Sequence, residues 1–88
     1  MPVTFAPRWK EELVCRMDGH CFIIEMTMGI AHVYLPDEEK WESGAPGWAK
    51  GQWSRVLADL EVWCRGQGLP LTVDGNTWVH FDPQGQDA

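Results

Sequence analysis

Cysteine is scarce in this 88-residue sequence, and the three that occur form no C-x-x-C pair. No H-x-x-x-H spacing occurs either, so the spacings common to zinc and redox sites are missing, and we expect no metal or cofactor. An odd number of cysteines without paired spacing is typical of a reducing compartment. No basic stretch followed by an apolar run marks the N-terminal segment for export, and the least polar stretch, residues 21–36, is interrupted by Glu25 and His32. The sequence therefore predicts a cytoplasmic protein without a membrane-spanning segment.

Basic side chains are also few. Seven Lys and Arg residues stand against 13 Asp and Glu residues, which gives a formal net charge of −6. The seven are spaced singly, so no basic patch is predicted that could hold a phosphate backbone or an anionic lipid surface. We therefore expect binding to neither nucleic acid nor membranes. An acidic surface suits a basic protein partner, and it also keeps a small protein soluble without any partner.

Recognised catalytic motifs are missing as well: the sequence has no nucleophile elbow, phosphate loop or zinc-protease helix. The remaining candidates are Cys21 beside His20 and the acidic run at residues 37–39. Adjacent residues of a strand point to opposite faces, so His20 is poorly placed to activate Cys21. The acidic run is typical of a solvated helix start. These patterns favour a protein that is not an enzyme.

The sequence does contain enough apolar residues for one core. Hydrophobic residues make up 44% of the chain and charged residues 23%, close to the composition of ordinary globular domains. A chain of this length builds a single core. We expect one domain at residues 1–82 and a flexible tail at residues 83–88.

Six tryptophans are the other feature in excess. Trp53 and Trp63 lie on a predicted helix stripe and are expected to pack in the core. Trp9, Trp41 and Trp48 lie at predicted element ends or loops, where two roles stay open. They could be exposed interface anchors, for which tryptophan is well suited, or they could cap the edge of the core.

The stretch CRMDGHC predicts a tight hairpin turn. Apolar residues alternate in the segments on either side of it, and they share one face only if Leu13 lies opposite Ile24. That register leaves the Asp-Gly pair as a two-residue type I′ turn, in which both residues need a positive φ. It points Cys15 into the core and Cys21 away from it, so we expect Cys21 to be the reactive thiol. A three-residue turn would place the two cysteines opposite each other, but it would divide the apolar set between two faces.

The following segments predict one more strand and one long helix. Residues 30–35 read as a third strand, which Pro36 closes, and Asp37 is expected to cap a short helical turn. A 3.6-residue apolar period predicts a helix from Pro46 to Gly66 or Gly68. Its buried stripe is predicted to hold Ala49, Trp53, Val56, Leu57, Leu60, Trp63 and Cys64.

Residues 69–73 and 77–81 flank an Asp-Gly-Asn segment and predict a second hairpin. A three-residue loop would point Val79 and Phe81 into the core, whereas a two-residue loop would point Trp78 and His80 inward. The three-residue loop is the preferred reading.

The predicted order is three strands, one helix and two strands. This is an α+β fold in which one long amphipathic helix packs on one face of a small antiparallel sheet. A single helix leaves the opposite side, here called the outer face, uncovered, and an apolar and aromatic face of this kind is typical of a binding surface. We predict contact with a protein partner, as in small inhibitor, immunity or adaptor proteins, or with a second copy of the chain, through Ile23, His32, Tyr34 and Trp78.

Two alternatives remain for the outer face. Residues 3–9 could fold across it and leave no interface. The face could also hold a small ligand-binding or catalytic site built from His32, Tyr34, His80 and Cys21. A partner interface should be flat or convex, whereas a ligand site should be a concave pocket in which polar groups converge.

Overall fold

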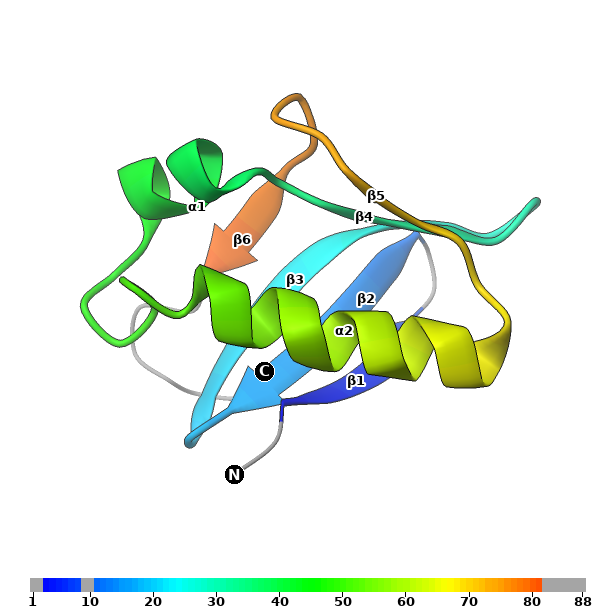
Figure 1. The fold of residues 1–88 in the computed structure, drawn as a ribbon, viewed down its shortest axis with the longest axis horizontal. Coiled ribbons are helices and arrows are strands. Elements are labelled where there is room, and N and C mark those ends of the chain that lie inside the picture. Colours follow the sequence, from blue (N-terminus) through cyan, green and yellow to red (C-terminus); the bar gives the residue numbers. More distant parts are fainter. Residues whose placement is uncertain (1–2, 9–10, 82–88) are drawn as a thin grey trace.

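The computed structural model describes residues 3–8 and 11–81 and shows an α+β protein (Figure 1). The elements in chain order are β1 (Thr4–Arg8), β2 (Glu12–Met17), β3 (His20–Thr27), β4 (His32–Leu35), α1 (Glu38–Gly44), α2 (Trp53–Gln67), β5 (Leu71–Val73) and β6 (Val79–Phe81). They form one six-stranded sheet in the order β1-β2-β3-β4-β5, with β6 paired to β3 beside this path. The predicted tail at residues 83–88 and Trp9 lie outside the described residues.

The hairpin of β2 and β3 confirms the predicted register. Leu13 lies opposite Ile24, and two residues form the turn. Asp18 has a φ of 52° and Gly19 a φ of 82°, the left-handed values that a type I′ turn requires at both positions.

Residues 4–8 form a strand that the sequence did not predict. They pair with β2 in an antiparallel ladder that begins with Thr4 opposite Arg16. The alternative in which the N-terminal segment folds across the outer face is therefore wrong for these residues. They extend the sheet at its edge.

The central strand, β3, has two partners along one edge. Its first half pairs with β6, with Ile23 opposite His80, and its second half pairs with β4, with Met26 opposite Val33. β5 pairs with the far edge of β4 in a parallel ladder. The predicted second hairpin and the wholly antiparallel sheet are therefore wrong. The reason is that both helices lie between β4 and β5 in the chain, and a helical crossover of this kind lets the next strand run parallel to the first.

The main helix is shorter than predicted at its start and ends where expected. α2 begins at Trp53 rather than at Pro46, and residues 47–51 form turns in which Gly51 has a left-handed φ of 75°. Gly68 ends the helix with a φ of 71°, and its N–H bonds to the carbonyl of Arg65, as a C-terminal cap does. No helix in the described ranges is long and apolar enough to cross a membrane.

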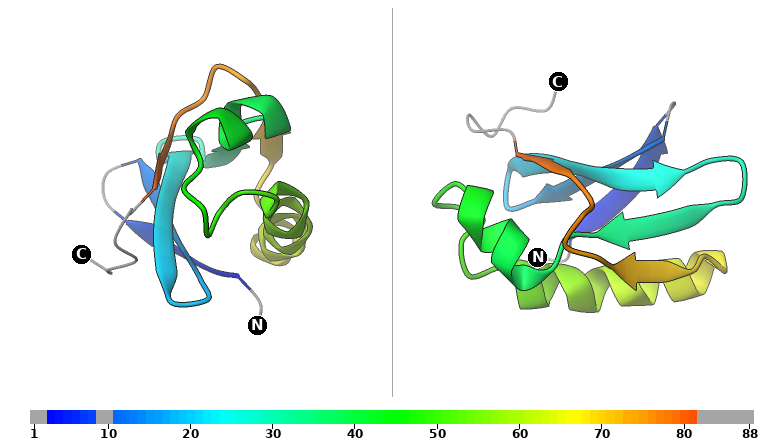
Figure 2. Two further views of the ribbon diagram at one scale, coloured as in Figure 1. Left: turned by 90° about the vertical axis from the view of Figure 1, so that its left-hand side faces the viewer. Right: turned by 90° about the horizontal axis from the view of Figure 1, so that it is seen from above.

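The core lies between the sheet and the two helices, which cover the same side of β2 and β3 (Figure 2). Of the predicted helix stripe, Val56, Leu60, Cys64 and Ala49 are buried, whereas Trp53, Leu57 and Trp63 are half-buried beside them. The predicted inward direction of Val79 and Phe81 is confirmed, because both pack against this core. Asp37 caps α1 as predicted, accepting a hydrogen bond of 2.8 Å from the backbone N–H of Lys40.

Trp41 corrects an expectation about the tryptophans. It was predicted at an element end as an interface anchor or an edge cap, but it is fully buried. The short helix α1 tilts its indole onto the edges of the Phe22 and Phe81 rings, at centroid distances of 5.1 and 4.8 Å. α1 is therefore part of the core and not merely a connection.

Candidate functional site

The outer face is the side of the sheet that neither helix covers (Figure 2). Its residues follow from the register, because directly paired residues of neighbouring strands share a face. Ile23 is paired with His80, and Tyr34 is paired with Thr72. Ile23 and Tyr34 alternate with buried residues of their strands, and the pairing places His80 and Thr72 on the same side as them.

One group on this face, the His32 patch, consists of His32, Tyr34 and Thr72. The two rings are stacked with centroids 4.4 Å apart and planes 12° apart. Nε2 of His32 lies 2.7 Å from the Thr72 hydroxyl of the neighbouring strand, within hydrogen-bond distance. These contacts hold the rings of β4 in place before any ligand or partner arrives.

A second group, the Trp78 patch, consists of Ile23, Trp78 and His80. The Trp78 and His80 rings meet edge to face, with centroids 5.1 Å apart. Ile23 lies beside His80 on the paired strand. Ile23 and Trp78 are half-buried and His80 is exposed, so part of each apolar side chain faces solvent.

The two patches lie along the same strand without converging. The His32 patch is fixed to β3 at Thr27 and the Trp78 patch at Ile23, four residues apart. At roughly 3.3 Å per residue these positions are about 13 Å apart. The predicted protein-binding residues therefore form an extended surface. His32 and His80 are not brought together as the alternative catalytic site would require.

Cys21 departs from its predicted exposure. It faces away from Cys15, as the register predicts, but the residue is only 7% exposed. Its small side chain lies across from Arg16, and the long aliphatic part of an arginine side chain can cover a short neighbouring side chain and exclude solvent from it. Burial raises the pKa of the Cys15 thiol well above its usual range and also raises the pKa of the Cys64 thiol. The expectation of one exposed, reactive cysteine is therefore wrong, and all three thiols are buried.

A carboxylate separates the two patches. Glu25 lies on the outer face between Ile23 and Thr27, and its direct neighbour on β2 is Glu12. Like charges placed opposite each other are unfavourable. Arg8 forms an ion pair of 2.8 Å with Glu12, so Glu25 supplies the negative charge at the centre of the surface.

Sequence reasoning missed a stacked pair at the other end of β3. The rings of His20 and Trp48 are parallel, with centroids 4.5 Å apart. Nδ1 of His20 and Nε1 of Trp48 are buried without a hydrogen-bond partner within the part of the chain that the structure describes. Trp48 also contacts the Phe81 ring. Of its two predicted roles, the structure therefore shows the edge cap.

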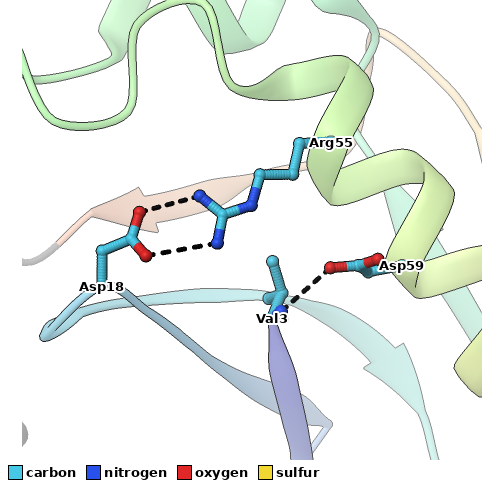
Figure 3. Close-up of polar contacts among 4 residues, drawn as sticks. All are labelled: Val3, Asp18, Arg55 and Asp59. Atoms are coloured by element: carbon cyan, nitrogen blue, oxygen red, sulfur yellow. Dashed lines mark hydrogen bonds and ion pairs between the residues drawn. The ribbon is translucent and has the colours of Figure 1, made fainter. Parts of the chain in front are cut away.

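Two polar contacts that tie α2 to the sheet were also missed (Figure 3). Arg55 donates hydrogen bonds of 2.7 and 3.2 Å to the two carboxylate oxygens of Asp18 in the hairpin turn. One helical turn later, Asp59 accepts a hydrogen bond of 2.9 Å from the backbone N–H of Val3. These pairs are 37 and 56 residues apart in the sequence, so no local pattern reveals them.

The first of these contacts predicts a pH dependence. Hydrogen bonds from Arg55 hold the pKa of Asp18 below its usual range. Because the folded-state pKa is lower than the unfolded value of about 3.9, the contact stabilises the protein above that pH and is lost as the pH falls through the folded pKa. We expect Asp18→Asn to lower the urea midpoint at pH 7 and to lose this effect at more acidic pH. A difference from wild type that persisted down to pH 2 would show that the charge of Asp18 is not its source.

Among the described residues, no group of three or more His, Cys, Asp or Glu side chains is arranged to hold a metal ion. Comparison of the chain with protein-family models, with curated proteins and with solved structures found no match. The geometry of the outer face is therefore the guide to function.

Proposed function

We propose that this chain is a non-catalytic protein-binding module that contacts a basic partner protein through its outer face. The observation that carries the proposal is the pair of pre-positioned aromatic patches on the side of the sheet that no helix covers (Figure 2). Aromatic side chains are enriched where interfaces gain most of their binding energy. Rings already fixed by their neighbours lose little conformational entropy on binding.

The spacing of the patches favours a protein over a small ligand. Their anchor points on β3 are about 13 Å apart, at roughly 3.3 Å per residue. A small molecule would need polar groups that converge in one pocket. A protein interface of standard size, about 800 Å² on each side, would cover both patches at once.

Charge favours a basic partner over a second copy of the chain. Each copy has a formal net charge of −6, and Glu25 lies at the centre of the proposed interface. Two such surfaces would repel each other, whereas a Lys or Arg of a partner would neutralise the charge of Glu25.

The test is Ile23→Glu, which adds a charge to the Trp78 patch. We expect loss of partner capture with little change in the unfolding midpoint, because a substitution at a partly exposed site costs little in the isolated fold. The matched control is Val62→Glu on α2, where the side chain is 62% exposed and capture should persist. Capture is measured from native cell extract with the immobilised protein, and self-association by sedimentation.

Two outcomes of the Ile23→Glu experiment would contradict the proposal. Self-association that Ile23→Glu abolishes would identify a second copy as the occupant in place of a basic partner. If Ile23→Glu instead destabilises a protein that sediments as a monomer at all concentrations, Ile23 belongs to a second layer of the core. The interface proposal would then be wrong.

A further inference from the structure

A groove of about 390 Å³ opens between β1 and α2, away from the residues of the two patches. Its lining consists of Val3, Thr4, Phe5, Asp59, Val62 and Trp63. Its volume is within the range of pockets that hold small molecules, roughly 300–1,000 Å³. The lining is mainly apolar and aromatic and contains a single carboxylate.

Two aromatic rings form one wall of this groove. The centroids of Phe5 and Trp63 are 5.6 Å apart and their planes are tilted by 44°. Both residues are half-buried, so part of each ring remains accessible. The faces of aromatic rings attract cations that come within about 6 Å of the centroid, and tryptophan does so most strongly.

The carboxylate of Asp59 supplies a negative charge beside these rings. Its Oδ2 is held by the backbone N–H of Val3, the one hydrogen-bond donor to it in residues 3–8 and 11–81. Arg55, one helical turn earlier, directs two guanidinium nitrogens at Asp18, and its charge also attracts the Asp59 carboxylate (Figure 3). The groove therefore combines an anion with an aromatic wall, the two features that recognise organic cations.

The type of cation follows from the scarcity of acceptors. A primary ammonium carries three N–H donors, each of which needs an acceptor. The side-chain acceptors of the described lining residues are the Asp59 carboxylate, one oxygen of which already accepts from Val3, and the Thr4 hydroxyl, which are fewer than three ammonium N–H groups require beside the backbone. A quaternary ammonium carries no N–H donor and presents methyl groups to its surroundings, which suits an apolar and aromatic wall.

The edge of β1 disfavours a peptide as the occupant. The hydrogen bond from the Met26 N–H to the Glu11 carbonyl shows which residues of β2 direct their backbone groups to β3. Alternation along the ladders then leaves Val3, Phe5 and Pro7 with backbone groups that point out of the sheet. The N–H of Val3 is taken by Asp59 and Pro7 has none, so an added strand would find only Phe5 fully free to pair.

We propose that this groove binds a small quaternary ammonium compound. Asp59 lies opposite the positive charge, and the rings of Phe5 and Trp63 pack against the methyl groups. The site is separate from the outer face, so it stands or fails independently of the protein-binding function.

Choline is the probe, and 3,3-dimethyl-1-butanol, which has the same shape without the charge, is its control. Titration of the ¹⁵N-labelled protein should move the amide signal of Val3 and the indole signal of Trp63. We expect choline to bind at least about tenfold more tightly than the neutral compound. Equal affinities would overturn the proposal, and this comparison uses the unaltered chain.

Asp59→Asn removes the negative charge but keeps the contact with β1, because the amide oxygen can still accept the hydrogen bond from the Val3 N–H. We expect choline affinity to fall about tenfold in this variant. Glu61→Gln removes the same charge from an exposed position of α2 and should leave the affinity unchanged. Unchanged binding in Asp59→Asn would overturn the assigned role of the carboxylate. Tighter binding of a trimethyllysine peptide than of choline would overturn the choice of a small molecule.

Discussion

Trp41→Ala should lower the free energy of unfolding by about 3–5 kcal/mol, the range for large buried aromatic residues. The Trp41 side chain is fully buried against Phe22 and Phe81. Its Nε1 donates a buried hydrogen bond of 2.9 Å to the carbonyl of Ala49, which would lose this donor. Domains of this size are stable by only about 5–15 kcal/mol, so the variant would be largely unfolded at modest denaturant concentrations. Urea unfolding followed by circular dichroism measures the change.

Two further variants separate packing from the hydrogen bond. Trp41→Phe keeps most of the aromatic packing and loses the N–H donor, so its cost should be smaller than that of Trp41→Ala. Trp78→Ala removes a half-exposed tryptophan from the outer face and should cost less than Trp41→Ala. Equal losses for Trp41→Ala and Trp78→Ala would show that α1 is not part of the core.

Leu60→Ala is the second large effect that we expect, with a loss of about 2–5 kcal/mol. Leu60 lies in the middle of α2 and is fully buried in the core. Its truncation removes apolar contacts and leaves a cavity that the surrounding core fills only in part. Glu61→Ala, one position along and exposed, should cost far less. Equal urea midpoints for the two variants would mean that α2 presents another side to the sheet.

The elements that the sequence predicted well are those in which the signal is local. The hairpin of β2 and β3 follows from alternating apolar residues and from one Asp-Gly pair that tolerates positive φ. The apolar stripe of α2 and its Gly68 cap lie within one continuous segment. In these regions chain propensity and tertiary packing favour the same conformation.

The second predicted hairpin failed although its turn residues were read correctly. Asp74 does form a turn, with its side chain accepting from the Asn76 N–H at 2.9 Å. Its own N–H, however, bonds to the carbonyl of Leu35, which keeps β5 on β4 while the chain continues to β3. Gly75 packs so closely on Asp37 that an added Cβ would lie 2.6 Å from the carboxylate. These are contacts with distant segments, which single-sequence patterns do not encode.

In the candidate sites, too, the sequence predicted what local patterns encode and missed the contacts between distant segments. Alternation along β3 and β4 placed Ile23, His32 and Tyr34 on one face, but it could not reveal that Thr72 would join them from a parallel strand. The groove depends on Asp59 meeting Val3, 56 residues away in the sequence. In the sequence Asp59 looks like one more charged residue on an amphipathic helix.

One edge of β3 is shared by two strands, β6 along its first half and β4 along its second, and this arrangement has a consequence for the synthesis of this protein. The edge of its first half is paired by β6, whose residues Val79–Phe81 are the last described strand of the chain. While these residues remain inside the ribosome, the hairpin and helices can form, but the central strand keeps an open edge and part of the Phe22 ring lacks its cover. Such an edge can pair with other nascent chains. Premature termination before residue 79 should therefore release a polypeptide that lacks β6 and aggregates through the open edge of β3, so that chaperones must hold it or proteases degrade it.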